Sequence, residues 1–277
     1  MTDHDTARTS RSASVRSSLD IPVDQPGRLV LSVAVAEHLR ASESLAITDG
    51  DGAPVDHQVL TLDHGSRLHL IDASAGSLHV DYSATVEVGE PGDQAVSDAD
   101  RFRYVLPSRY CPSDRLEGFV AGEFGPVVDD AQTLGRVVSW VSERLAYTPG
   151  STTSTDDALA PLLSGQGVCR DYAHLVVTMC RALGMPARYV SVYAPGLSPM
   201  DAHAVVEVAV DGVWRVVDAT HLAPRASMVR TATGRDATDT AILTSLGAIT
   251  QPPRFEVMAT ADPDLPTEDP EAEVSLA

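Results

Sequence analysis

Lysine is absent from the 277 residues, so all 20 basic side chains are arginines, and 39 acidic side chains oppose them. The formal net charge is −19 at pH 7. A surface of this sign repels the phosphates of nucleic acids and the headgroups of anionic lipids. We therefore expect no nucleic-acid partner and no role at a membrane surface.

Cysteine is also scarce, with only Cys111, Cys169 and Cys180. An odd, small number of cysteines with no secretory apolar segment before them does not fit a disulfide framework, and it predicts a reducing, cytoplasmic location. No stretch of about 18 apolar residues occurs, which excludes an ordinary membrane-spanning helix. Hydrophobic residues still make up 43% of the chain, enough to bury a core in one or two domains.

The pattern along the chain predicts two folded domains between disordered ends. Residues 1–18 are polar and rich in serine and threonine, which is typical of a disordered leader, and residues 261–277 form an acidic, proline-punctuated tail. Residues 19–118 hold short alternating apolar runs separated by turn pairs, which predicts an N-terminal β domain. Residues 119–260 begin with helical periodicity and continue into β-branched runs, which predicts a mixed domain.

Four of the five histidines in the N-terminal β domain show no metal-ligand spacing, so we expect them to face solvent. They are His57, His64, His69 and His79.

A cysteine stands where the mixed domain changes from a glycine turn to a helix, in GQGVCRDYAHLVVTMCRALG. Apolar residues recur on one helical face from Tyr172 to Leu183, and Gly184 with Pro186 ends the helix. Cys169 therefore lies at the helix N-terminus, where unpaired N–H groups and the dipole stabilise a thiolate and could bind an oxyanion. Cys180 lies roughly 16 Å further along the axis, so we expect it in the core.

A histidine and an acid follow in DAHAVVEVAVDGVWRVVDATHL, where the Asp-Gly pair at 211–212 predicts a two-residue hairpin turn. Pairing Val210 with Val213 sets the register. Because side chains alternate between faces, His203 then shares a face with Asp218 as its diagonal neighbour, within reach of a carboxylate–imidazole hydrogen bond.

Other interpretations of these residues remain open on the spacing alone. A histidine and an aspartate at two strand ends are commonly surface residues. His174 lies off the face of the helix that carries Cys169, and His221 has the opposite strand parity to Asp218. A zinc site formed by Cys169, His174 and His203 would lack the usual ligand spacing, so the sequence predicts no metal and no cofactor.

Together these segments resemble the transglutaminase-like superfamily of papain-fold cysteine enzymes, in its bacterial branch with an N-terminal β domain. The resemblance depends on GVCRDYAHLVVTMCRALGMPARYVSVY, DAHAVVEV and WRVVDAT, and extends to YVLPSRYCPSD before the core and ATGRDATD after it. It implies an α+β fold: an antiparallel β-sandwich-like domain, followed by a core in which the nucleophile helix packs on an antiparallel sheet. Val205 and Ala219 stand where many members have an aromatic residue and a proline, which affects the expected shape of the acyl pocket.

The resemblance also implies site roles, with Cys169 as nucleophile, His203 as general base and acid, and Asp218 as the residue that orients the histidine. The oxyanion donor is expected to be the backbone N–H of Cys169, with Gln166 and the hydroxyl of Tyr147 as further candidates. Cys111 is expected to be a packing residue, and the segment GRDATD is expected to form a loop over the site.

The expected chemistry is attack on an amide or peptide bond through a thioester at Cys169, followed by release to water or to an amine. The expected partners are a peptide or protein substrate and a small amine acceptor. The missing lysine means that the chain cannot donate a lysine side chain for cross-linking itself. The alternatives are a peptidase dedicated to one substrate and a catalytically silent module that binds a partner through the same fold. The sequence does not predict the oligomeric state.

Overall fold

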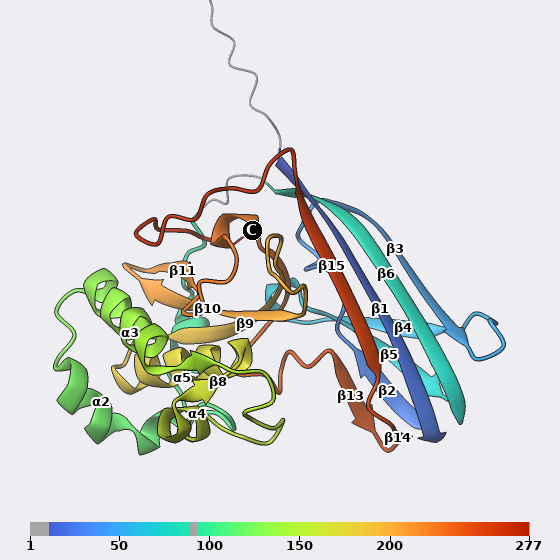
Figure 1. The fold of residues 1–277 in the computed structure, drawn as a ribbon, viewed down its shortest axis with the longest axis horizontal. Helices are drawn as coiled ribbons and strands as arrows, with labels where there is room; N and C mark the ends of the chain where they lie inside the picture. Colours follow the sequence, from blue (N-terminus) through green and yellow to red (C-terminus); the bar gives the residue numbers. More distant parts are fainter. Residues whose placement is uncertain (1–10, 89–92, 277) are drawn as a thin grey trace, which may run out of the picture.

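The computed structural model describes residues 11–88 and 93–276, which form two lobes (Figure 1). The lobe on the right of Figure 1 is a two-layered stack of β-sheets and is called the sandwich lobe here. The lobe on the left combines helices with a four-stranded sheet and is called the mixed lobe. The predicted α+β class, with an N-terminal sandwich and a helix packed on an antiparallel sheet, is confirmed.

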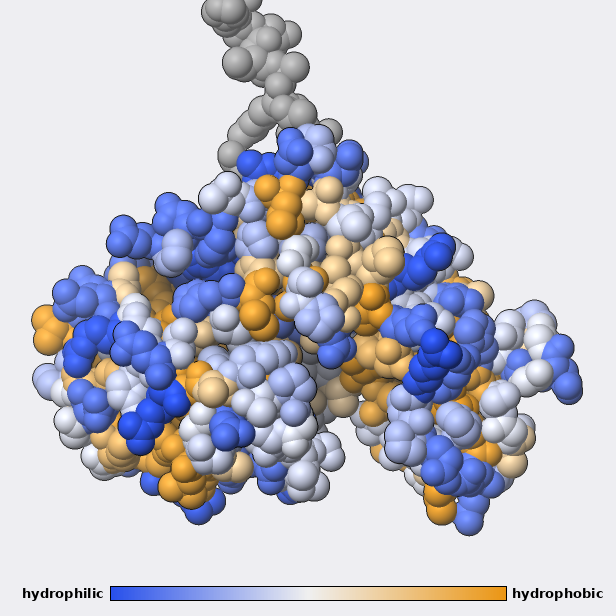
Figure 2. Space-filling view, in the orientation of Figure 1, coloured by the Kyte–Doolittle hydropathy of each residue, from blue (hydrophilic) through white to orange (hydrophobic). Residues whose placement is uncertain are grey.

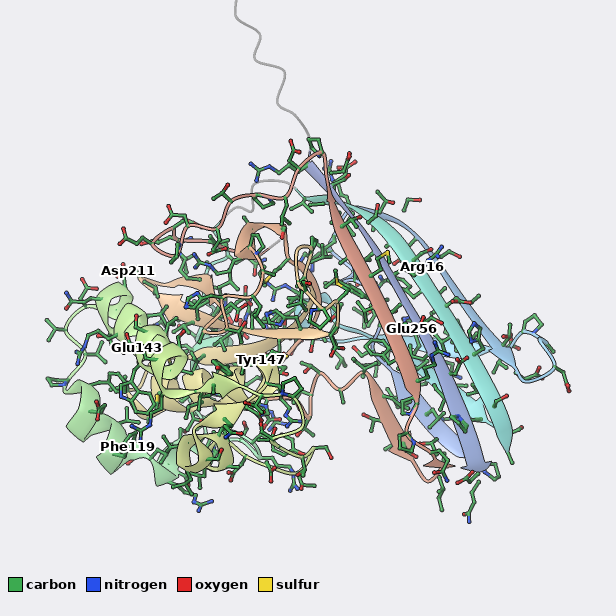
Figure 3. The ribbon with its side chains drawn as sticks, viewed as in Figure 1. Arg16, Phe119, Glu143, Tyr147, Asp211 and Glu256 are labelled. Carbon is green, nitrogen blue, oxygen red and sulfur yellow. The ribbon has the colours of Figure 1, made fainter. Side chains whose placement is uncertain are left out.

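Two sheets of antiparallel strands make up the sandwich lobe. The elements are β1 (Arg11–Gln25), β2 (Gly27–Leu31), β3 (Ala41–Asp49), β4 (His57–Thr61), η1 (Asp63–Gly65), β5 (Arg67–Ala73), β6 (Gly76–Val88), β13 (Leu243–Leu246), β14 (Ile249–Thr250) and β15 (Arg254–Asp262). The outer sheet has the order β14-β1-β6-β3, with β15 also on β1, and the inner sheet has the order β13-β2-β5-β4. Arg16 and Glu256 lie on neighbouring strands of the outer sheet (Figure 3).

The strand β1 corrects the prediction of a disordered leader over residues 1–18. Residues 11–18 pair with both β6 and β15, because Ala13, Val15 and Ser17 alternate with polar residues and bury one face of the strand. Because the buried residues of this segment are mostly small, its alternation of buried and exposed positions is not evident from the sequence. Residues 1–10 lie outside the described part of the chain.

The C-terminal strands also correct the predicted domain boundaries. β13, β14 and β15 come from residues 243–262 but pair with β2 and β1, so they complete the sandwich rather than the mixed domain of residues 119–260. Conversely, part of the predicted β domain belongs to the mixed lobe, because Tyr104 packs edge-on against Trp214 with their ring centroids 5.8 Å apart. His69 is buried rather than solvent-facing, and its ring lies 5.1 Å from that of His57.

The mixed lobe has a sheet of order β11-β10-β9-β12 with helices on it. The elements are α1 (Asp98–Arg103), η2 (Ser113–Arg115), α2 (Glu117–Phe124), α3 (Asp130–Arg144), β7 (Ala146–Tyr147), α4 (Leu159–Ser164), β8 (Gln166–Gly167), α5 (Cys169–Ala182), β9 (Ala187–Tyr193), β10 (His203–Val210), β11 (Val213–Val217), η3 (Arg225–Ser227) and β12 (Val229–Gly234). Helix α5 packs on β10 and β9 and against α3. Its apolar face, including the fully buried Cys180, forms the centre of this core. No helix within the described ranges is long and apolar enough to cross a membrane.

The segment after β15 corrects the prediction of a disordered tail over residues 261–277. It returns along the edge strand β11, where the carbonyl of Val274 accepts a hydrogen bond from the Val216 N–H at 2.7 Å. The Arg225 guanidinium donates to the Glu268 carboxylate at 2.7 Å, and Leu276 is only 2% exposed. Burial of Val274 and Leu276 explains the order of this acidic segment, which its composition does not predict.

A buried ionic cluster ties three strands of the mixed sheet together. The Glu207 carboxylate of β10 accepts hydrogen bonds from Arg188 of β9 and from Arg230 of β12, with N···O distances of 2.7 Å. Burial alone would raise the pKa of Glu207, but the charges and hydrogen bonds of the two arginines outweigh it and lower the pKa to about 2. A guanidinium nitrogen of Arg188 also lies 3.1 Å from Nδ1 of His64 in the sandwich lobe, so the cluster extends across the interface between the lobes.

Candidate active site

The N-terminus of α5 positions a sulfur in a partly buried place. Cys169 is the first residue of the helix, and the Asp171 carboxylate caps it by accepting a hydrogen bond from the Val168 N–H at 2.8 Å. The Thr152 hydroxyl donates to the same carboxylate at 2.6 Å. Gly167 is needed here because a Cβ at this position would lie 2.7 Å from the Cβ of Asp171. Packing at Gly167 and capping by Asp171 therefore fix the path of the backbone that leads into Cys169.

The hairpin of β10 and β11 has the predicted register. Val210 pairs with Val213 across a turn in which Asp211 and Gly212 both have positive φ, at 49° and 81°. With no bulge in this pair, His203 and Asp218 extend from the two strand ends on one face. Their side chains meet, with 2.7 Å between His203 Nε2 and an oxygen of Asp218.

The Asp218 carboxylate is buried and fully engaged. Its second oxygen accepts hydrogen bonds from the backbone N–H and the hydroxyl of Thr220, at 2.9 and 2.7 Å. Burial alone would raise the pKa of Asp218, but the hydrogen bonds from His203 and Thr220 and the charge of His203 lower it. The carboxylate thus stays ionised beside the imidazole.

The imidazole of His203 is buried, and both Asp218 and the Cys169 sulfur lie close enough to influence its pKa. Nε2 is taken by Asp218, whereas Nδ1 is buried and makes no hydrogen bond of ordinary geometry within the described residues. The sulfur of Cys169 lies 3.8 Å from the carbonyl oxygen of Ala202, the residue next to His203. Burial lowers the pKa of His203, but hydrogen bonding and charge from Asp218 and Cys169 together raise it to about 10. The arrangement therefore favours an imidazolium beside the sulfur at neutral pH.

The two predicted oxyanion candidates lie on the short strand pair before α5, in which Tyr147 of β7 is paired with Gly167 of β8. Tyr147 is 43% exposed and lies in the mixed lobe (Figure 3). Burial and the nearby Cys169 sulfur raise the pKa of the Tyr147 hydroxyl to about 12, while hydrogen bonding with the Cys169 backbone lowers it in part. The hydroxyl thus stays neutral beside both the sulfur and the amide. Gln166 is exposed, and its backbone N–H and carbonyl exchange hydrogen bonds with the hydroxyl of Ser164.

The other candidate histidines lie apart from this group. His174 is buried against the rings of Tyr110 and Tyr189, and its Nε2 accepts a hydrogen bond from the Ala237 N–H at 3.1 Å. Burial lowers the pKa of His174 to about 4. His221 is exposed. Within residues 11–88 and 93–276, no group of three or more histidine, cysteine, aspartate or glutamate side chains is arranged to hold a metal ion.

The remaining cysteines and the GRDATD segment have packing roles in the structure. Cys111 and Cys180 are fully buried, and burial raises the pKa of each thiol to about 12. The loop after β12 crosses to α5, where Ala237 contacts His174 and the Asp236 carboxylate accepts from the Tyr110 N–H at 3.0 Å.

Two residues that support the site were not predicted from the sequence. Asp171 is 1% exposed and orders the helix N-terminus, and Thr220 holds the carboxylate that faces His203. Both had a signal. An acid at the third position of a helix is a capping pattern, and a threonine two residues after an aspartate is typical of a turn closed by side-chain hydrogen bonds.

Residues 119–219 match the model of the transglutaminase-like superfamily. This matched region is called the transglutaminase-like core below. The matched region begins within α2 and ends just after Asp218, so it includes the cysteine, the histidine and the acid described above.

A solved structure extends the similarity beyond the transglutaminase-like core. A protein from Cytophaga hutchinsonii, which its authors named a "putative cysteine protease", is 29% identical, with a TM-score of 0.82 over 96% of this chain and 96% of that one. The sandwich lobe and the transglutaminase-like core therefore occur together in that protein as well.

Two mycobacterial relatives are uncharacterized proteins. The one from Mycobacterium leprae is 30% identical over 54% of this chain and 57% of its own length, and the one from Mycobacterium tuberculosis is 29% identical over 38% and 33%. This chain thus spans little more than half of the first relative and a third of the second.

Proposed function

We propose that the protein is a cysteine enzyme that acts on amide or peptide bonds through a thioester at Cys169. The observation that carries the proposal is the meeting of three groups: a sulfur at a capped helix N-terminus, an imidazole whose pKa is raised to about 10, and a buried carboxylate 2.7 Å from that imidazole. This is the set of groups that nucleophilic acyl transfer by a thiolate requires.

In the proposed reaction, the thiol proton resides on His203 and the thiolate attacks the carbonyl carbon. A C–S bond forms, the carbonyl oxygen becomes an oxyanion, and His203 protonates the leaving nitrogen as the C–N bond breaks. Water then gives up a proton to His203 and attacks the thioester carbon; the C–S bond breaks, which returns the thiolate and releases a carboxylic acid. An amine that attacks in the same way forms a new amide. Asp218 keeps the imidazole in the orientation needed for both proton transfers.

The backbone N–H of Cys169 and the hydroxyl of Tyr147 are the proposed oxyanion donors. Tyr147 is favoured over Gln166 because its hydroxyl is neutral and interacts with the Cys169 amide, whereas the Gln166 side chain is exposed. We favour hydrolysis over transfer because Cys169 is only partly buried, so water has access. The three free cysteines support a cytoplasmic location.

Alkylation by iodoacetamide tests the reactive pair without a known substrate. At pH 7 the sulfur of Cys169 should react at least about tenfold faster than a simple thiol in solution, and His203→Ala should remove the difference. His79→Ala, which changes a half-exposed histidine of the sandwich lobe, is the matched control. Peptide mapping separates Cys169 from the two buried cysteines. An ordinary rate that does not respond to His203→Ala would instead favour a silent binding module.

Turnover is tested on a panel of short amides and unfolded proteins, with and without a primary amine such as cadaverine. Hydrolysis releases a carboxylic acid at a rate that the amine does not change, whereas transfer incorporates the amine. Cys169→Ala should abolish either reaction.

A further inference from the structure

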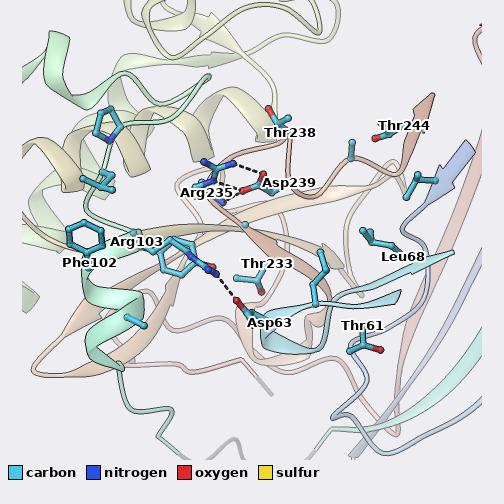
Figure 4. Close-up of a pocket in the computed structure, with 18 residues that line it drawn as sticks. Thr61, Asp63, Leu68, Phe102, Arg103, Thr233, Arg235, Thr238, Asp239 and Thr244 are labelled. Atoms are coloured by element: carbon cyan, nitrogen blue, oxygen red, sulfur yellow. Dashed lines mark hydrogen bonds and ion pairs between the residues drawn. The ribbon is translucent and has the colours of Figure 1, made fainter. Parts of the chain in front are cut away.

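A cleft lies between the two lobes (Figures 2 and 4). Its volume is about 1220 Å³, and both lobes line it. One wall is the exposed face of the inner sheet, where Val30, Leu68 and Thr244 come from adjacent strands. The opposite wall comes from the mixed lobe and includes Phe102 and Leu106.

Large apolar side chains are exposed on both walls. Phe102 is 70% exposed, and Leu62 and Leu106 are 42% and 43% exposed. Leu60 and Leu246 continue the inner-sheet wall, because Leu60 pairs with Leu68 and Leu246 lies two residues beyond Thr244 on the same face. Contiguous exposed apolar surface of this kind is typical of a binding site.

The charged groups that line the cleft neutralise one another. Arg103 pairs with Asp63 across the cleft at 2.7 Å, and Arg235 pairs with Asp239 at 2.9 Å (Figure 4). These four are all the charged residues of the described lining, whose other polar side chains include four threonines. On a molecule of net charge −19 this lining carries no net charge, and its exposed side chains include large apolar ones, so it suits an uncharged occupant with apolar side chains.

The size and edge of the cleft favour a polypeptide over a small molecule. Small-molecule pockets typically have about 300–1000 Å³ and enclose their ligand, whereas this cleft is larger and open. The edge strand β4 also leads to it, with Thr61 and Leu62 in the lining. An edge strand offers backbone groups to which an extended chain can hydrogen-bond.

Helix α5 connects the cleft wall to the sulfur. Arg181, in the last turn, donates to the carbonyls of Leu106 and Arg235 at 3.1 and 2.7 Å, and both residues line the cleft. Cys169 stands at the other end of the same helix, about 20 Å away for 14 residues. An extended chain of about six or seven residues covers that distance.

From this geometry we infer that the cleft is a second binding site for substrate, which holds an uncharged, apolar, extended stretch of polypeptide about six or more residues from the bond under attack. The inference rests on the proposed function, since it makes the occupant part of the substrate. It identifies the substrate as a polypeptide with an apolar segment rather than a small amide.

Binding is tested on the full chain carrying Cys169→Ala, so that turnover plays no part. The probes are two fluorescein-labelled dodecapeptides, one made of Leu, Phe, Thr, Ser and Gln, the other with four apolar residues replaced by Asp. Anisotropy should report binding of the uncharged peptide only. Phe102→Asp, on one wall, and Leu246→Asp, next to the opposite wall, should each weaken it at least about tenfold, whereas Leu163→Asp, an 86% exposed site outside the cleft, should change it less than twofold.

The inference is overturned if the uncharged peptide does not bind, if Leu163→Asp weakens it as much as the cleft variants, or if only a small apolar dye occupies the cleft. With active protein, Phe102→Asp should raise KM for a long apolar substrate and leave kcat and the turnover of a short amide unchanged. Absence of all amide turnover would instead contradict the proposed function. The binding measurement would still show whether the cleft binds the uncharged peptide.

Discussion

Replacing Glu207 by Gln should destabilise the mixed lobe strongly. The carboxylate is fully buried between Arg188 and Arg230, which are at most 1% exposed. The variant removes the buried carboxylate that the two guanidinium groups share, and breaking a buried ion pair in this way costs about 3–5 kcal/mol. The lowered pKa of Glu207 gives a second figure for the free energy that the ion pairs contribute. A fall from 4.5 to about 2 corresponds to about 3 kcal/mol.

Thermal and urea unfolding measure this loss. For a chain of this size, we expect the melting temperature of Glu207→Gln to fall by at least about 6 °C. Glu256→Gln is the control, because Glu256 pairs with Arg254 at the surface and both side chains are more than half exposed. Its melting temperature should change by no more than about 1 °C.

The acid dependence has a defined sign. Because the pKa of Glu207 is lower in the folded protein, its stabilisation is present above pH 4.5 and is lost as the pH falls toward 2. Glu207→Gln should therefore lose about 3 kcal/mol less than the unchanged protein between pH 5 and pH 2. Equal melting temperatures for Glu207→Gln and Glu256→Gln, or parallel acid profiles, would refute the role given to the cluster.

Three further substitutions have expected outcomes. Asp218→Asn should keep the fold, because the amide still accepts hydrogen bonds, but lower kcat for an amide about 10³-fold or more by removing the charge beside the imidazole; a loss below tenfold would contradict the proposed mechanism. Gly167→Ala should lower the unfolding free energy by about 1–3 kcal/mol, because its Cβ would overlap the acid that caps α5, whereas Gly122→Ala, with open space around it, should be neutral or slightly stabilising in the same urea titration. Leu276→Ala should cost about 2–4 kcal/mol if the C-terminal segment is docked as described, and the half-exposed Leu265→Ala should cost well under 1 kcal/mol by calorimetry.

The parts of the site that were predictable have local causes. The Asp-Gly turn at 211–212 sets the register of one hairpin, and strand alternation then places His203 and Asp218 on one face, as observed. Helical periodicity and a glycine stop define α5, so Cys169 at its N-terminus also follows from neighbouring residues.

The parts that were missed depend on partners distant in the sequence. Residues 11–18 are ordered by pairing with residues 256–262, and no pattern of serine and alanine indicates that contact. The acidic C-terminal segment is held by Arg225 and by burial of Leu276, neither of which its composition reveals. The boundary near residue 118 failed for a related reason, since Tyr104 belongs to a core whose other members follow a hundred residues later.

The pairing of β1 with β15 makes the order of synthesis relevant to folding. The first described strand acquires its last neighbour only after residues 254–262 have left the ribosome, so the sandwich stays open along one edge while the rest of the chain is made. Separating the chain at any point between β6 and β13 would leave that edge bare. We therefore do not expect the N-terminal strands alone to be transferable as an independent module.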